Sequence, residues 1–305
     1  MYELIIVGGG PGGVAAGVYA ARKKIKTALI TDSFGGQSIV SNDIQNWIGV
    51  KSLTGLDLAK MLEEHLRAQA GFDIVDGDSV TQVSDVGDKF ALTTQGGKNL
   101  ETKYLLLATG SRHRKLNIPG EKEFDGKGIV YCSTCDAPLF SGKAVAIVGG
   151  GNAGLEAALD SLPYAAKIYL LERSGQLKGD PVTQEKIKAD PKVEVILNAE
   201  SQRVSGDQFV NALVYKDLPT GEEKTLAVEG VFVEIGAVPN AEFVKDLVER
   251  NKFGEVVVNH QTQATSHPRI WAAGDVSDVL YKQNNVSAGD AVKAVLNIYE
   301  KISKG

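Results

Sequence analysis

The pattern of apolar and polar positions contains the same module twice. In each copy a short apolar run ends in glycines, continues into a stretch with helical spacing, and leads to a second apolar run. The first copy joins the apolar runs 4–7 and 27–30 through a helix at 14–22, and the second joins 145–148 and 167–171 through a helix at 155–162. The order strand, glycine turn, helix, strand predicts the opening of a doubly wound parallel sheet, and therefore an α/β fold.

Shorter apolar runs occupy the rest of the chain. They predict strands at 73–75, 79–84, 90–94, 104–110, 193–196, 208–215, 224–228 and 231–235, and helices at 58–69 and 288–302. Residues 54–57 resemble a capping box at the start of the first of these helices. No low-complexity tract or long linker separates the segments. With 305 residues, the chain has the length of two domains.

Composition narrows the functional classes. Hydrophobic residues make up 43% of the chain and the formal net charge is -5. These values are typical of a globular protein that needs no disulfide staples, and they provide no basic footprint for nucleic acid or an anionic membrane. The chain opens directly on a strand, so we expect no targeting segment and a cytoplasmic location.

Two cysteines, Cys132 and Cys135, are the complete set in the sequence. A secreted disulfide scaffold has more, and a zinc site usually has four ligands, which these cysteines and the distant histidines do not offer. A lone C-x-x-C in such a chain indicates a redox-active pair. Two unrelated small core residues are the alternative.

The glycines of both modules have the spacing of a dinucleotide fingerprint. They are Gly8, Gly10 and Gly13 in the first copy, and Gly149, Gly151 and Gly154 in the second. The first glycine makes a tight turn, the second lets a pyrophosphate approach the backbone, and the third lets helix and strand pack closely. Two fingerprints therefore predict two bound dinucleotides. Asp32 and Glu172 follow at the distance of a ribose-binding acid, although Asp32 could equally be a turn residue.

These motifs, in this order, resemble the low-molecular-weight thioredoxin reductase family along the whole chain. The matching segments are 8–13, 35–37, 46–47, 108–110, 132–136, 149–152, 236–240 and 273–275. The flavoprotein subunit of alkyl hydroperoxide reductase has the same core and is similar in the segments 119–121, 138–140 and 281–283. That subunit normally carries an N-terminal thioredoxin-like extension, and we expect none in this protein.

The resemblance implies two Rossmann-like, three-layer ββα domains, the second inserted in the first. Residues 1–115 and 243–305 would bind FAD, and residues 116–242 would bind NADH or NADPH and carry the disulfide. The implied FAD residues are Gly8, Gly10, Pro11, Gly13, Asp32, Gly35, Gly36, Gln37, Asn46, Thr109, Gly110, Gly274, Asp275, Lys282 and Gln283. The implied NAD(P)H residues are Gly149, Gly151, Asn152, Ala153, Gly154, Glu172, Arg173, Lys178 and Gly236.

The resemblance also assigns roles around the cysteines. Cys135 would face the flavin, Cys132 would attack a partner protein, and Asp136 would relay the proton of thiol–disulfide exchange. A helix-capping role is the alternative for Asp136. NADH is favoured over NADPH, because Glu172 would repel a 2′-phosphate, although the positive charges of Arg173 and Lys178 would attract it.

Four functions remain open at this stage. The first is a reductase of a thioredoxin- or glutaredoxin-like dithiol protein, and the second is an alkyl hydroperoxide reductase-like flavoprotein that serves a peroxiredoxin through a separate carrier. The third is a dithiol oxidase, which the second fingerprint disfavours, and the fourth is a redox sensor without turnover. We also expect a homodimer, and a rotation of the inserted domain about crossings near 113–116 and 240–243.

Overall fold

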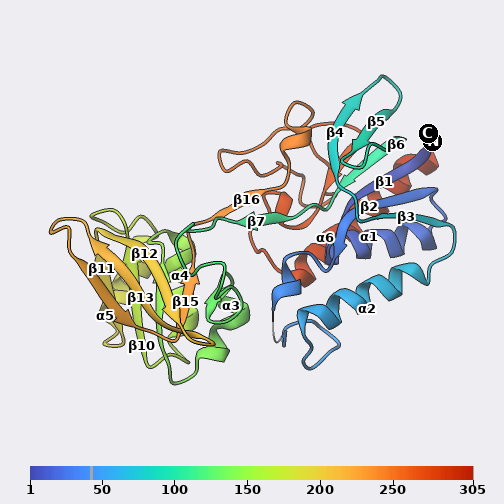
Figure 1. Cartoon of the computed structure of the whole chain (residues 1–305). Helices are drawn as coiled ribbons and strands as arrows, with labels where there is room; N and C mark the ends of the chain where they lie inside the picture. Colours follow the sequence, from blue (N-terminus) through green and yellow to red (C-terminus); the bar gives the residue numbers. More distant parts are fainter. Residues whose placement is uncertain (42–43, 305) are drawn as a thin grey trace. The chain divides into compact units, whose positions relative to one another are not determined.

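The structure, a computed structural model, describes residues 1–41 and 44–304. The chain divides into two compact units, one formed by Met1–Arg112 with Val238–Gly305 and the other by His113–Ala237. Each unit combines parallel strands, helices and antiparallel strands (Figure 1). In unit 1 the antiparallel strands continue the same sheet, whereas in unit 2 they form a sheet of their own. This confirms the predicted α/β class with two Rossmann-like folds, the second inserted in the first.

Unit 1 is built on a seven-stranded sheet with the order β3-β2-β1-β6-β5-β4, in which β17 also pairs with β6. Its elements are β1 (Tyr2–Gly9), α1 (Pro11–Arg22), β2 (Thr27–Phe34), η1 (Gly36–Val40), α2 (Gly55–Arg67), β3 (Phe72–Asp76), β4 (Val80–Asp85), β5 (Phe90–Thr94), β6 (Asn99–Leu107), η3 (Glu242–Val244), β17 (Ile270–Ala272), η4 (Gly274–Val276) and α6 (Asn284–Lys304). The pairs β1–β2, β1–β6, β2–β3 and β6–β17 are parallel, whereas β4, β5 and β6 run antiparallel. One core packs α1, α2 and α6 on the sheet, and a second lies between the sheet, the β4–β5 arm and the segment 241–258.

Helix α2 begins at the position that the segment 54–57 predicted. The hydroxyl of Thr54 accepts a hydrogen bond from the backbone N–H of Asp57 at 3.1 Å, which satisfies one of the free donors of the first turn. The N-cap half of the expected capping box is therefore present, whereas the Asp57 carboxylate accepts the Thr54 hydroxyl instead of the Thr54 backbone N–H.

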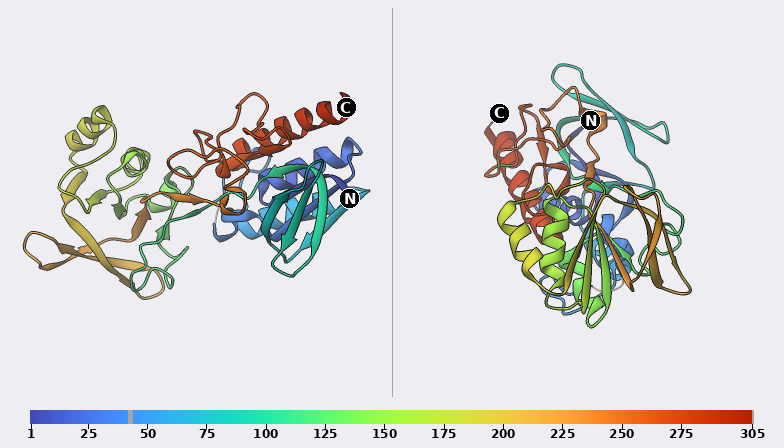
Figure 2. Two further views of the ribbon diagram at one scale, coloured as in Figure 1. Left: turned by 90° about the horizontal axis from the view of Figure 1, so that it is seen from above. Right: turned by 90° about the vertical axis from the view of Figure 1, so that its left-hand side faces the viewer.

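Unit 2 has three layers. The five-stranded sheet β11-β10-β9-β15-β8 is parallel throughout, and the three-stranded sheet β12-β13-β14 is antiparallel. The elements are β8 (Ile129–Val130), α3 (Ser133–Asp136), η2 (Ala137–Phe140), β9 (Ala144–Val148), α4 (Asn152–Ser161), β10 (Lys167–Glu172), α5 (Pro181–Ala189), β11 (Val193–Leu197), β12 (Ala199–Gly206), β13 (Val210–Asp217), β14 (Glu223–Ala227) and β15 (Gly230–Val233). The right-hand view of Figure 2 shows the parallel strands between α4 and α5 on one side and the antiparallel sheet on the other.

Two short strands, β7 (Ser111–His113) and β16 (Ala237–Pro239), lie where the chain passes between the units, and they pair with each other. Within unit 1, Thr109 Oγ1 donates to the carbonyl oxygen of Asn240 at 2.7 Å, and Asn240 Nδ2 donates back to that of Thr109 at 2.9 Å. These reciprocal bonds tie the outgoing and returning segments together.

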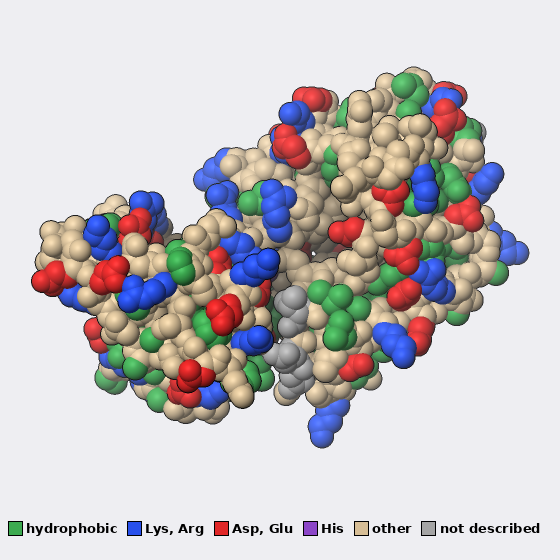
Figure 3. Space-filling model, in the orientation of Figure 1, with side chains coloured by type: hydrophobic (Ala, Val, Ile, Leu, Met, Phe, Trp, Pro, Cys, Tyr) green, Lys and Arg blue, Asp and Glu red, His purple; other side chains and the backbone are tan. Residues whose placement is uncertain are grey.

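Both signs of charge are scattered over each unit on the face drawn in Figure 3. Within residues 1–41 and 44–304, no helix combines the length and the apolar character that a membrane span requires.

The core of unit 2 provides a stability prediction. Phe232 is fully buried on β15 and packs edge-to-face on Phe140 at 5.2 Å between ring centroids. Phe232→Ala should lower the free energy of unfolding by about 3–5 kcal/mol, because it leaves a cavity. Phe209→Ala removes the same ring at a site that is 63% exposed and should change stability little. Urea unfolding of both variants tests this; equal losses would contradict it.

Candidate functional site: the redox disulfide and two nucleotide-binding turns

Cys132 and Cys135 form a disulfide with their Cα atoms 5.4 Å apart. Cys132 is the N-cap residue of α3, and its carbonyl oxygen accepts the backbone N–H of Asp136 at 3.0 Å. The first N–H groups of a helix favour negative charge beside them, so this position suits a thiolate once the disulfide is reduced.

Carboxylates hold the redox segment from two sides. Asp160 on α4 accepts hydrogen bonds from the hydroxyls of Ser133 (2.9 Å) and Thr134 (3.1 Å), the two residues between the cysteines. On the other side the buried Glu121 accepts the Tyr131 hydroxyl at 3.1 Å. Tyr131 directly precedes Cys132, so the pair is fixed at both its entry and its centre.

Glu121 also anchors the start of unit 2. Its two carboxylate oxygens accept the backbone N–H groups of Leu116 (2.8 Å) and Asn117 (2.6 Å). The ring of His113 stacks on Tyr131 at 5.3 Å. Burial is the main cause that lowers the pKa of His113, with the charge of Lys115 adding to it. These contacts join the incoming chain to the residue before the disulfide.

Asp136 is buried and stands one residue beyond Cys135. Burial raises the pKa of its carboxyl to about 6, so it holds a proton more readily than an exposed aspartate. Its side chain makes no capping hydrogen bond at the start of η2. The capping alternative is therefore contradicted, whereas the proton-relay role stays a prediction.

The second fingerprint forms the turn between β9 and α4. Gly149 has a φ of +128°, and a Cβ there would lie 2.3 Å from the carbonyl oxygen of Glu234. A Cβ on Gly154 would lie 1.7 Å from the carbonyl oxygen of Gly149, whereas a Cβ on Gly151 would meet nothing within 4 Å. The turn therefore packs tightly at its first and third glycines and is open at the second. That is the pattern a pyrophosphate requires.

Glu172 ends β10 beneath this turn. It accepts the backbone N–H of Gly150 at 2.8 Å, together with the N–H (2.8 Å) and hydroxyl (2.7 Å) of Ser174. Burial alone would raise the pKa of Glu172, but these hydrogen bonds outweigh it and lower the pKa. The residue is therefore a buried, ionised carboxylate.

The predicted basic neighbours of Glu172 are paired with carboxylates. Lys178 lies 3.5 Å from Glu172, and Arg173 forms an ion pair with Glu200 at 2.8 Å. Asn152 and Ala153 begin α4, and the side chain of Asn152 accepts the N–H of Asp180 at 2.8 Å. Gly236 lies in the segment after β15, where its carbonyl oxygen accepts the N–H of Arg114.

The first fingerprint faces a cavity of about 310 Å³ within unit 1. Ten of the fifteen residues predicted for FAD line it: Gly8, Gly10, Pro11, Asp32, Gly36, Gln37, Thr109, Gly110, Gly274 and Asp275. A Cβ on Gly10 would have no neighbour closer than 3.8 Å, and one on Gly13 would lie 1.8 Å from the carbonyl oxygen of Gly8. Burial raises the pKa of the Asp275 carboxyl at the cavity wall, although Lys282 opposes this. A cradle of glycine backbone with the exposed carboxylate of Asp32 and the half-buried carboxyl group of Asp275 fits the pyrophosphate and hydroxyl groups of a dinucleotide.

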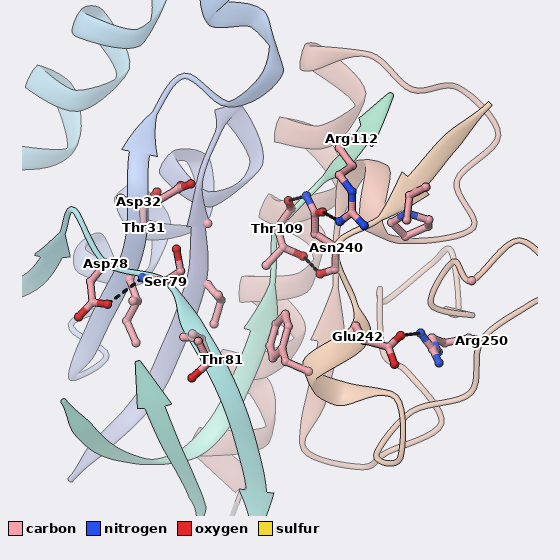
Figure 4. Close-up of a pocket in the computed structure, with 18 of the residues that line it drawn as sticks. Thr31, Asp32, Asp78, Ser79, Thr81, Thr109, Arg112, Asn240, Glu242 and Arg250 are labelled. Atoms are coloured by element: carbon pink, nitrogen blue, oxygen red, sulfur yellow. Dashed lines mark hydrogen bonds and ion pairs between the residues drawn. The ribbon is translucent and has the colours of Figure 1, made fainter. Parts of the chain in front are cut away.

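A second cavity of about 950 Å³ shares Gly8, Asp32, Thr109 and Asn240 with the first. Figure 4 shows Thr31 and Asp32 of β2 on one side of it, and Thr109, Arg112 and Asn240 on the other. Asp32 lies within β2, so it is not a turn residue. The two cavities together extend from the glycine turn past the end of β2, which is where the adenosine half of a dinucleotide lies in this fold.

The other five predicted FAD residues line neither cavity: Gly13, Gly35, Asn46, Lys282 and Gln283. Gly13 and Gly35 support the site indirectly, the first through its packing on Gly8 and the second by starting η1 with a φ of +93°. Asn46 Nδ2 donates to Gln283 Oε1 at 3.3 Å, and Lys282 donates to the carbonyl oxygen of Ser277 at 2.6 Å. Conversely, Asn240 lines both cavities and ends the matching segment 236–240, but the sequence predicted only a hinge there and no part in a nucleotide site.

Comparisons with known proteins agree with this geometry. The sequence pattern of the family described as pyridine nucleotide-disulphide oxidoreductase matches residues 2–294. The chain is 42% identical over 299 residues to an NADH dehydrogenase of Bacillus subtilis, and 42% identical over 305 residues to the F subunit of alkyl hydroperoxide reductase from Pseudomonas aeruginosa. These alignments cover 98% and 99% of the chain but 58% of each relative, so the chain spans less than two thirds of their length.

Solved structures show the same fold at full length. A thioredoxin reductase from Streptococcus pyogenes superposes with a TM-score of 0.92 at 29% identity, covering 100% of this chain and 99% of that one. A thioredoxin reductase from Giardia duodenalis gives the same TM-score at 28% identity, with 99% of each chain covered.

The second fingerprint generates a test that separates folding from nucleotide binding. Gly151→Ala should fold normally but weaken NADH binding at least about tenfold, because the new methyl group points into the open part of the turn. Gly154→Ala should instead lower the melting temperature, because its Cβ would clash with the carbonyl oxygen of Gly149. Calorimetry of NADH binding and thermal unfolding measure the two effects. Unchanged NADH affinity in Gly151→Ala would refute the predicted site.

Proposed function

The chain belongs to the pyridine nucleotide-disulphide oxidoreductase family, and on that premise we propose that it passes electrons from a nicotinamide dinucleotide, through FAD and the Cys132–Cys135 disulfide, to a small thioredoxin- or glutaredoxin-like dithiol protein. The unit formed by His113–Ala237 would hold the nicotinamide dinucleotide and the disulfide, and the other unit would hold FAD.

One observation carries the proposal. Asp160 lies on α4, the helix that begins at the second fingerprint, and accepts hydrogen bonds from the hydroxyls of Ser133 (2.9 Å) and Thr134 (3.1 Å) between the cysteines. A single helix thus joins the proposed nicotinamide-binding turn to the disulfide.

The residues present account for the exchange step. FAD, when bound, supplies the two-electron relay between the nicotinamide and the disulfide. In the reduced pair, the thiolate of Cys132 at the N-terminus of α3 attacks one sulfur of the carrier disulfide and forms a mixed disulfide. Cys135 then attacks Cys132, which restores the intramolecular disulfide and releases the carrier as a dithiol. Asp136, the residue after Cys135, would protonate the thiolate that leaves the carrier disulfide.

A second candidate is the role of an alkyl hydroperoxide reductase flavoprotein, in which a separate carrier passes the electrons to a peroxiredoxin. The 42% identity to the Pseudomonas aeruginosa relative supports it. The two functions differ in the final acceptor and share the chemistry at the cysteines. Under either function, a homodimer and a rotation of the inserted unit stay predictions.

The order of the cysteines predicts which one a carrier meets. Cys135→Ser keeps the attacking thiol of Cys132 and should accumulate a mixed disulfide with a thioredoxin-like protein, because no second thiol is left to resolve it. Cys132→Ser should trap none. Non-reducing electrophoresis of the two variants with the same carrier gives the answer. The reverse pattern would overturn the assigned roles.

The charges near Glu172 predict the donor. We expect kcat/KM for NADH to exceed that for NADPH by on the order of tenfold, because the ionised Glu172 would face the 2′-phosphate while Arg173 and Lys178 are paired with carboxylates. Glu172→Gln should bring the kcat/KM values for NADH and NADPH closer together. Arg173→Ala, which removes an exposed ion pair, should change their ratio little. Steady-state rates with both donors decide this. A preference for NADPH would contradict it.

A further inference from the structure

Asp160 lies where helix α4 meets the redox segment. It belongs to the last turn of α4, and its Oδ2 atom accepts the hydroxyls of both Ser133 (2.9 Å) and Thr134 (3.1 Å). These two residues form the whole link between Cys132 and Cys135. One carboxylate oxygen therefore holds both of them, and its negative charge lies beside the redox pair.

Helix stability does not account for an acidic residue at this position. The C-terminal end of a helix carries a partial negative charge and favours basic side chains. The last turn of α4, which the structure describes completely, has no basic residue, and Asp160 adds a full negative charge to this end. A local conflict of this kind is expected at functional sites.

The neighbouring charged groups have the same sign. Glu156 lies one turn before Asp160 on α4, and Asp136 ends α3. Burial and then the charges of Asp160 and Glu156 raise the pKa of Glu234, the residue after β15, to about 8. A thiolate formed beside Asp160 is therefore repelled by it, whereas the N-terminus of α3 stabilises that thiolate.

We propose that Asp160 lowers the reduction potential of the Cys132–Cys135 pair, because its charge disfavours the thiolate of the reduced form. The reduced pair is thereby a stronger electron donor to its carrier. Asp160 is a positioning residue, since it contacts Ser133 and Thr134 and not the sulfurs. The inference rests on the proposed function and names a residue that tunes it.

The equilibrium with dithiothreitol isolates this effect. Dithiothreitol gives up two electrons and closes its own S–S bond, while the Cys132–Cys135 bond opens. Where the reduced pair holds one thiolate and one thiol, one of the two dithiothreitol protons passes to the pair and the other to solvent. Reduction then adds one negative charge to the pair, and the charge of Asp160 opposes it.

Asp160→Asn tests the charge, because an amide oxygen still accepts both hydroxyls but carries no charge. The intact chain is equilibrated in dithiothreitol redox buffers between about pH 5.5 and 9, with thiol labelling as readout. At the upper end, the variant should shift toward the dithiol by on the order of tenfold, or about 30 mV for a two-electron couple. The difference should shrink as the pH falls through the pKa of the attacking thiol, since the reduced pair is then uncharged.

Ser133→Ala combined with Thr134→Val cuts the same link and leaves the charge in place. The carboxylate loses the two donors that offset its charge, so this variant should shift toward the disulfide, opposite to Asp160→Asn. A purely structural clamp predicts no shift in Asp160→Asn and a shift toward the dithiol in the double variant. Either of those results would refute the proposal, and the double variant tests it alone if Asp160→Asn fails to fold.

Glu156→Gln is the matched control, because it makes the same carboxyl-to-amide change one turn earlier at an exposed position. Its shift should be smaller than that of Asp160→Asn, since water and salt screen an exposed charge. A shift of equal size would contradict the assignment to Asp160.

Dithiothreitol supplies the electrons in these measurements, so their results do not depend on the donor or the carrier. Whether NADH reduces the disulfide of the FAD-loaded protein is measured separately, by thiol labelling after anaerobic mixing. Failure of that reaction would count against the proposed function and leave the effect of Asp160 on the potential measurable.

Discussion

The close approach of the first and third glycines in each fingerprint is the constraint on which both sites depend. In unit 1 the carbonyl oxygen of Gly8 fills the space of a Cβ on Gly13, and in unit 2 that of Gly149 does the same at Gly154. This packing starts each helix directly at the carboxyl end of its strand. The free N–H groups of the helix then point into the turn, where an anionic pyrophosphate gains most from them. The close packing of the first glycine's carbonyl oxygen on the third glycine therefore determines both where each helix starts and where the nucleotide would bind.

Carboxyl groups in unit 2 show how the same functional group takes different protonation states. Glu172 is buried but receives hydrogen bonds from Gly150 and Ser174, which lower its pKa. Asp136 is buried without such donors, and its pKa rises to about 6. Glu234 lies among like charges as well, and its pKa rises to about 8. Burial raises the pKa at all three positions, hydrogen-bond donors reverse its effect at Glu172, and neighbouring negative charge adds to it at Glu234.

The redox pair depends on contacts that are distant in sequence. Asp160 on α4 holds the hydroxyls between the cysteines, and Glu121 holds Tyr131 immediately before them. The segment thus has a fixed conformation in the disulfide form while Cys132 remains at a helix start. Thiol–disulfide exchange benefits from this arrangement, because the attacking sulfur is positioned and its negative charge is stabilised by the same turn.

The sequence by itself determined the local units: the strand–turn–helix modules, the cysteine pair, and the capping box at Thr54 all follow from spacing and residue type within a few positions. It predicted no element at β12 or α5, whose residues lack a clear apolar period, no role for Glu234, and for Asn240 only a place in a hinge. Only the tertiary structure showed that Asn240 hydrogen-bonds to Thr109, 131 positions away, and that the carbonyl oxygen of Glu234 lies against Gly149. The physical reason is that hydrogen bonding and the pKa of a polar side chain depend on the groups that folding places around it, whereas turn and helix signals act between neighbours along the chain.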